Sequence, residues 1–167
     1  MTIEQVNAFG LADFIEKIGW VFEHSPWVAQ RAWPNRPFKD VAALHRAMAA
    51  EMWSASAEEQ LALLIAHPDL GARARMSEAS VSEQAGAGLN QLTREEFDAL
   101  HRLNSEYKQK FGFPFLYAVK GSTKQDILEA LSRRLTREKA EEFRVALAQV
   151  LRIAEFRLED LINGTVS

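Results

Sequence analysis

An apolar stripe of helical period near the C-terminus limits the fold of this 167-residue chain more than any other feature. From Thr136 onward, apolar residues recur at three- and four-residue intervals and therefore share one side of a long helix. The stripe consists of Phe143, Leu147, Val150, Leu151, Ala154, Leu158, Leu161 and Ile162. We expect one long final helix that begins after Thr136 and ends near Asn163-Gly164, a plausible C-cap.

Capping-box pairs mark three more helix starts, because a Ser or Thr and a Glu or Gln three residues later satisfy each other's backbone N–H groups. These pairs are Thr2 with Gln5, Ser56 with Glu59 and Thr93 with Glu96. The helix after Ser56 is expected to carry Leu61, Leu64 and Ile65 at helical spacing. It should stop at His67-Pro68, since a proline disfavours helix at the residue before it.

The Thr93 pair predicts a second long helix, from Arg94 to about Phe111. Its apolar side is formed by Phe97, Leu100, Leu103 and Tyr107. Gly112 and Pro114 end it, because neither residue suits a helix interior.

Only the short segment "FPFLYAV", residues 113–119, has the pattern of an extended chain. One such segment cannot build a sheet, so the predicted class is all-α. The length fits one domain, and the chain contains no internal repeat, low-complexity tract or dividing linker. We therefore expect a single compact multi-helix domain over residues 1–167.

Composition excludes several classes of protein and site. A net charge of −3 argues against a nucleic-acid-binding protein, which usually has a basic surface. The absence of cysteine removes disulfides, thiolate nucleophiles and thiolate metal ligands. No secretory signal is present, and no apolar run reaches the roughly 20 residues that cross a bilayer. The expected location is the cytoplasm, without membrane association.

His67, in "AHPDLGA", is the first candidate for chemistry. It ends an apolar helix beside a rigid proline, and histidine is the side chain whose ordinary pKa suits proton transfer near neutral pH. The competing interpretation is a histidine that interacts with the last carbonyl groups of the helix.

The segment "SVSEQAGAGL", residues 80–89, is the second candidate. Ser80, Glu83 and Gln84 share one helix face at spacings of three and four residues. Ser80 and Glu83 also fit a capping box, with Ser80 as the N-cap, whereas Gln84 is not needed for one. A helix N-terminus additionally offers N–H donors to a polar or anionic ligand, so both interpretations stay open.

Arg157 is the third candidate because it lies inside the broad apolar sector of the final helix, unlike Arg144 and Arg152. Such an arginine either extends to the surface or points into a pocket and meets an anion. A buried guanidinium needs a carboxylate partner, from the protein or from a ligand.

Signatures of metal and cofactor binding are missing from the sequence. His24, His45 and His101 lie in different segments without metal-ligand spacing, and there is neither a Gly-rich phosphate loop nor a Gly-x-Ser-x-Gly motif.

Five segments together resemble one enzyme family, the 2-oxo-4-hydroxy-4-carboxy-5-ureidoimidazoline (OHCU) decarboxylases of uric acid degradation. These are "FEHSPWVAQRAWPNRPF" (22–38), "HPDLG" (67–71), "SVSEQAGAGL" (80–89), "LNSEYKQKFGFPF" (103–115) and "RIAEFRL" (152–158). The resemblance covers nearly the whole chain. It implies an all-helical homodimeric carboxy-lyase, without metal or organic cofactor, that converts the unstable product of hydroxyisourate hydrolysis to (S)-allantoin.

The resemblance also implies roles for individual residues. His67 and Glu83 would be the catalytic groups, and Ser80 and Gln84 would hold polar groups of the substrate. Arg157 would pair with an anionic or carbonyl oxygen, and Pro68 would form the floor beside His67. Backbone groups of residues 115–119 would bind the ring edge, which fits an extended segment with unpaired N–H and C=O groups. These residues are Phe115, Leu116, Tyr117, Ala118 and Val119.

Two alternatives are compatible with the same fold. One is a helical binding module that has lost catalysis, and the other is an enzyme that acts on a related ureido acid. The retention of His67, Glu83, Gln84 and Arg157 together argues against the binding module.

Overall fold

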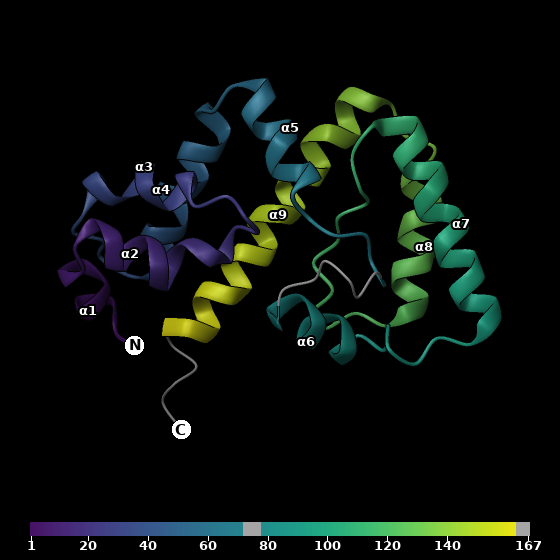
Figure 1. The fold of residues 1–167 in the computed structure, drawn as a ribbon, viewed down its shortest axis with the longest axis horizontal. Coiled ribbons are helices and arrows are strands. Elements are labelled where there is room, and N and C mark those ends of the chain that lie inside the picture. The colour runs from purple at the N-terminus through teal and green to yellow at the C-terminus, as the bar shows by residue number, and fades with distance from the viewer. Residues whose placement is uncertain (72–77, 163–167) are drawn as a thin grey trace. The chain divides into compact units, whose positions relative to one another are not determined.

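Within the part of the chain that the structure describes, all regular secondary structure is helical (Figure 1). The structure is a computed structural model, which describes residues 1–71 and 78–162, except for the side chains of residues 78–80. The α-helices are α1 (Ile3–Ala8), α2 (Leu11–Ile18), α3 (Trp27–Ala32), α4 (Val41–Ser54), α5 (Ala57–Ile65), α6 (Glu78–Gly86), α7 (Arg94–Phe111), α8 (Lys124–Arg134) and α9 (Lys139–Ile162). The all-α prediction is confirmed.

The chain divides into two compact units, each with its own core. Unit 1 comprises residues 1–66 and 151–167, and unit 2 comprises residues 67–150. Helix α9 belongs to unit 2 up to Val150 and to unit 1 from Leu151.

In unit 1, α3 packs against both α2 and α4. The largest fully buried side chains of this unit are Phe14, Phe22, Ile18, Leu44, Met48, Met52, Leu63 and Leu64. Asn7 ties the segment before α4 to α1, because its side chain donates to the Phe38 carbonyl (2.9 Å) and accepts from the Phe38 N–H (2.7 Å).

The helix boundaries follow from local sequence. Both capping-box hydrogen bonds are present at Thr2, Ser56 and Thr93, as predicted, and a fourth box at Thr123 starts α8. Helix α7 ends at Gly112, whose φ of 81° is left-handed and whose N–H donates to the Lys108 carbonyl. The predicted end of the long second helix is therefore confirmed.

The predicted apolar sides of α5 and α7 are partly wrong. Leu61 and Ile65 are exposed (38% and 55%), and α5 buries Leu63 and Leu64. Phe97 is also exposed, with its ring against His101. The buried side of α7 consists of Leu100, Asn104, Tyr107 and Phe111. Helical spacing alone does not say which side of a helix meets the core.

Most of the predicted stripe on α9 is buried, through Leu147, Val150, Ala154, Leu158 and Ile162. The other three predicted members are half-buried, namely Phe143, Leu151 and Leu161. The start of α9 at Lys139 lies slightly later than expected, and the predicted C-cap at Asn163-Gly164 lies outside the described residues. The stripe also contains two buried charges, Glu142 and Arg157, of which the sequence analysis singled out only Arg157.

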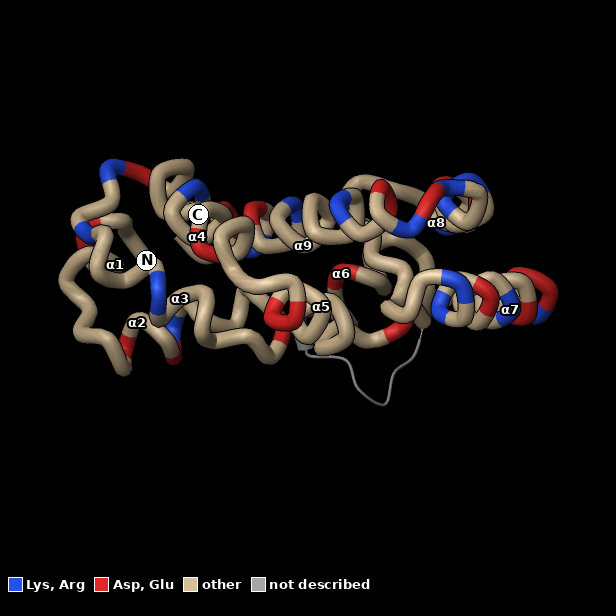
Figure 2. The backbone as a smooth tube through the Cα atoms, turned by 90° about the horizontal axis from the view of Figure 1, so that it is seen from above, with Lys and Arg blue, Asp and Glu red and all other residues tan. Residues whose placement is uncertain are grey.

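Glu142 is the centre of a buried polar cluster in unit 2, where α7 and α8 run side by side (Figure 1). Its Oε1 accepts from the Tyr107 hydroxyl (2.5 Å) and from Arg134 Nε (2.5 Å). Arg134 Nη1 donates to the Leu116 carbonyl (2.6 Å), and its guanidinium lies 4.5 Å from the Phe115 ring centre. The cluster therefore fixes the 113–119 segment. Along α7, basic and acidic residues alternate (Figure 2).

We predict that Tyr107→Phe makes the protein less stable below pH 10 and that this difference shrinks at higher pH. Burial, and then the hydrogen bond to Glu142, raise the pKa of Tyr107 above its usual range. The folded state therefore keeps a proton that the unfolded chain loses above about pH 10, so this stabilising contribution is complete below that pH and declines above it. Thermal unfolding of both proteins from about pH 8 to about pH 11 measures the gap, and a gap independent of pH would contradict the prediction.

Candidate functional site

His67 lies in unit 2, in the loop that follows α5. Helix α5 ends at Ile65, as the proline predicted, and the His67 side chain is buried (7% exposed). Pro68 and Asp69 beside it are half-buried, and Leu70 is buried. The loop therefore turns its histidine away from bulk solvent.

Helix α6 carries the other predicted polar residues of unit 2. It begins at Glu78, so Ser80 lies inside the helix, and the prediction that Ser80 is the N-cap is wrong. The Ser-x-x-Glu spacing fits any helix face and does not by itself identify the first helical residue. The Ser80 side chain lies outside the described residues, whereas Glu83 is half-buried and Gln84 is buried (7% exposed).

A hydrogen bond joins the "HPDLG" and "SVSEQ" segments. Gln84 Oε1 accepts from the backbone N–H of Gly71 at 2.9 Å. Gln84 thus holds the loop that carries His67, a contact that the sequence analysis did not predict. It explains why a residue that no capping box requires is buried here.

Backbone groups in the 113–119 segment are more fully satisfied than expected. The Leu116 carbonyl accepts from Arg134, and the Ala118 N–H donates to Gln149 Oε1 at 2.8 Å. The Val119 carbonyl accepts from the Ser122 N–H at 3.0 Å. The expectation of unpaired backbone groups is therefore wrong for these three, and their hydrogen bonds orient the segment. Phe115, Leu116 and Val119 are buried, and Tyr117 and Ala118 are half-buried.

Arg157 belongs to unit 1 and is buried (4% exposed). Its Nη2 donates to Glu23 Oε1 at 3.0 Å, and its Nη1 donates to the Val21 carbonyl at 3.3 Å. Of the two alternatives from the sequence, extension to the surface is excluded. The protein itself supplies a carboxylate partner, Glu23, which lies in the "FEHSPW" segment and was missed as a candidate.

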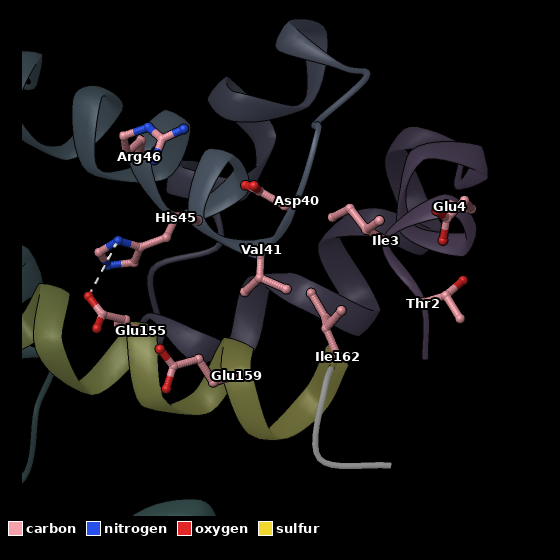
Figure 3. Close-up of a pocket in the computed structure, with 11 residues that line it drawn as sticks. Thr2, Ile3, Glu4, Asp40, Val41, His45, Arg46, Glu155, Glu159 and Ile162 are labelled. Atoms are coloured by element: carbon pink, nitrogen blue, oxygen red, sulfur yellow. Dashed lines mark ion pairs between the residues drawn. The ribbon is translucent and has the colours of Figure 1, made fainter. Parts of the chain in front are cut away.

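Unit 1 also contains a cavity of about 750 Å³ between the starts of α1 and α4 and the end of α9 (Figure 3). His45 lies in it, with Nε2 2.8 Å from the Leu151 carbonyl and Nδ1 3.9 Å from Glu155 Oε2. Glu4, Asp40, Arg46 and Glu159 also line it, with apolar walls that include Val41 and Ile162. None of the predicted site residues lines this cavity, so it does not mark the predicted site.

Among the described residues, no three His, Asp or Glu side chains are grouped so that they could hold a metal ion. None of the described helices combines the length and apolar character that crossing a membrane requires.

Comparison with known proteins gives consistent results. The family model "OHCU decarboxylase" matches residues 7–159. The chain is 46% identical to a 2-oxo-4-hydroxy-4-carboxy-5-ureidoimidazoline decarboxylase of Haloferax volcanii, over 98% of both chains. It is 44% identical to the uric acid degradation bifunctional protein PucL of Bacillus subtilis, over 97% of this chain and 33% of that protein. The solved structure of an (S)-allantoin synthase is similar with a TM-score of 0.81 and 31% identity, over 97% of this chain and 54% of that one.

The buried Arg157–Glu23 pair predicts a large loss of stability for Glu23→Gln. The substitution keeps the side-chain shape but leaves the buried guanidinium without a carboxylate, at a cost of about 3 kcal/mol. Arg157→Met should be costly for the same reason, and the double variant should lose less than the sum of the two.

Urea unfolding of the four proteins measures this coupling. The control is Glu16→Gln, at an exposed position on α2, which should change the free energy of unfolding by less than about 0.5 kcal/mol. Additive effects of the two single substitutions would show that the pair does not couple.

Proposed function

The chain belongs to the OHCU decarboxylase family, and from this premise we propose that it decarboxylates OHCU to (S)-allantoin in urate degradation. The observation that supports the proposal best is the buried His67 in unit 2. Its loop is held by the hydrogen bond from Gly71 to Gln84, which joins the "HPDLG" and "SVSEQ" segments. We further propose that residues 1–167 act as one functional domain, since the family match extends through both units.

The substrate can provide its own electron sink. Its carboxylate is attached to a carbon next to a C=N bond. When the C–C bond to CO2 breaks, its electron pair forms a C=C bond, and the C=N pair moves to nitrogen, which takes a proton. A proton then adds to the ureido-bearing carbon as the adjacent hydroxyl loses its own, so one proton is consumed overall. The protein must supply orientation, partial desolvation and a proton on one face.

His67 is the proposed source of that proton, with Glu83 as the second catalytic group. A histidine can both donate and accept a proton near neutral pH. Its buried position limits competition from water, and delivery from one side would make a single enantiomer. Pro68 restricts the backbone beside it and forms the floor of the site.

The remaining proposed contacts orient the substrate. Ser80 and Gln84 would bind polar groups of the ureido arm and the ring, and the backbone of Phe115 to Val119 would follow the ring edge. Arg157 would bind an anionic or carbonyl oxygen, with Glu23 holding its guanidinium in a fixed plane. We also propose a cytoplasmic location and a homodimer, of which the resemblance implies the homodimer.

We predict that His67→Ala lowers turnover by about 10²- to 10⁴-fold, the usual contribution of a general acid or base. Freshly made substrate is required, so urate is oxidised and hydrolysed in the cuvette. Product is then followed by ultraviolet absorbance and optical activity. His101→Ala, at an exposed position on α7, is the matched control.

The outcomes separate the alternatives. Acceleration by the unmodified protein with one enantiomer of product supports a decarboxylase. No acceleration indicates a binding module, and turnover of only another ureido acid indicates a related enzyme. If His67→Ala works at the unmodified rate, His67 is not the catalytic group.

For Arg157→Lys we predict a fall of about tenfold or more in kcat/KM. Lysine keeps the charge but loses the planar fork that can contact Glu23 and a substrate oxygen together. The control is Arg144→Lys, at an exposed position of the same helix. Unchanged kinetic constants would place Arg157 outside the site.

A further inference from the structure

One peptide group in the loop of His67 is held on both sides by buried amide side chains. Asn104 Nδ2 on α7 donates to the Leu70 carbonyl at 3.1 Å. Gln84 Oε1 on α6 accepts from the Gly71 N–H at 2.9 Å. The Leu70 carbonyl and the Gly71 N–H belong to the same peptide bond, so the two contacts together fix the orientation of its plane.

Burial makes these contacts specific. Asn104 and Gln84 are 5% and 7% exposed, so water cannot readily replace either amide. By comparison, the contact between Asp69 and Lys108 on the same loop has a lysine that is 51% exposed and a separation of 3.3 Å. An exposed ion pair of this kind contributes little to holding a loop.

Gly71 allows the peptide plane to take this orientation. Its φ is +82°, in the left-handed region that a side chain strains. A Cβ atom there would also lie 3.0 Å from Leu100 Cδ2, so the buried side of α7 closes against this residue. At the other end of the loop, Pro68 has a fixed φ and restricts the backbone of His67, so the loop is constrained at both ends.

We propose that Asn104 is a positioning residue, which sets the direction of the His67 ring by fixing the Leu70–Gly71 peptide together with Gln84. The proposal rests on the function proposed above. Neither residue needs to touch the reacting atoms for this role. Their effect passes through the five-residue loop 67–71.

The same geometry determines what Gln84 can offer to a ligand. Its carbonyl oxygen is already used by the Gly71 N–H, so its amide nitrogen remains as a donor of hydrogen bonds. The amide nitrogen of Gln84 suits a carbonyl oxygen, in the ureido arm or the ring.

The test uses two substitutions that keep the branched shape of the Asn104 side chain at Cγ. Asn104→Leu removes both polar ends, and Asn104→Asp keeps the shape but replaces the N–H donor by an oxygen. We expect kcat to fall about tenfold or more in both, with KM within about threefold of the original. Exchange of the Gly71 amide hydrogen, measured by NMR well below the unfolding midpoint, should become at least about tenfold faster.

The matched control is Asn90→Asp, which makes the same charge change at an exposed position of unit 2. It should leave kcat and Gly71 exchange unchanged. Gln84 provides a second comparison. Gln84→Glu keeps an acceptor for the Gly71 N–H, so exchange should stay slow while KM rises. Gln84→Met removes the acceptor as well, so exchange should become faster and KM should also rise.

Activity and exchange report separately. A protein without activity would refute the proposed function, whereas slow Gly71 exchange that depends on Asn104 would still show the held peptide. If both Asn104 variants keep the original kcat, or lose activity with Gly71 exchange unchanged, Asn104 does not position His67. A fall in kcat with a rise in KM by a similar factor would also overturn the proposal, because it indicates general damage to the site.

Discussion

The two charges buried within the apolar stripe of α9 set the strongest condition on this structure. Each has to be compensated inside its own unit, since removing the partner of a buried ion costs about 3–5 kcal/mol. In unit 2, Glu142 is paired with Arg134 and accepts from Tyr107. In unit 1, Arg157 is paired with Glu23. The core of each unit is therefore organised around an ion pair as well as around apolar side chains.

Both ion pairs also hold backbone that lies outside the α-helices. Arg134 uses another nitrogen to hold the Leu116 carbonyl in the segment proposed to bind the substrate ring. Arg157 likewise holds the Val21 carbonyl close to Glu23. A buried guanidinium has five N–H donors, so one arginine can satisfy both a carboxylate and a backbone carbonyl. In this way the interior of each unit fixes backbone that the α-helices do not hold.

Sequence patterns predicted local features well and partner choice poorly. The capping boxes at Thr2, Ser56 and Thr93 were correct because their hydrogen bonds join residues only three apart. Ser80 has the same spacing to Glu83, yet α6 begins two residues before it. The exposure of Phe97 was missed because a helical stripe can extend beyond the core that covers it. Local sequence indicated five candidates, namely His67, Ser80, Glu83, Gln84 and Arg157. The resemblance added Pro68 and residues 115–119 and implied the role of each residue.

By itself, the sequence determined the all-helical class, the starts of α1, α5 and α7, the ends of α5 and α7, most of the buried stripe of α9 and the family. These depend on interactions within a turn or two of helix, or on motifs that can be read directly. Only the tertiary structure decided that Glu23 serves Arg157, at a sequence separation of 134 residues, and that Asn104 serves Leu70, at a separation of 34. The physical reason is that a buried donor requires an acceptor but does not specify which one. The packing of the helices makes that choice.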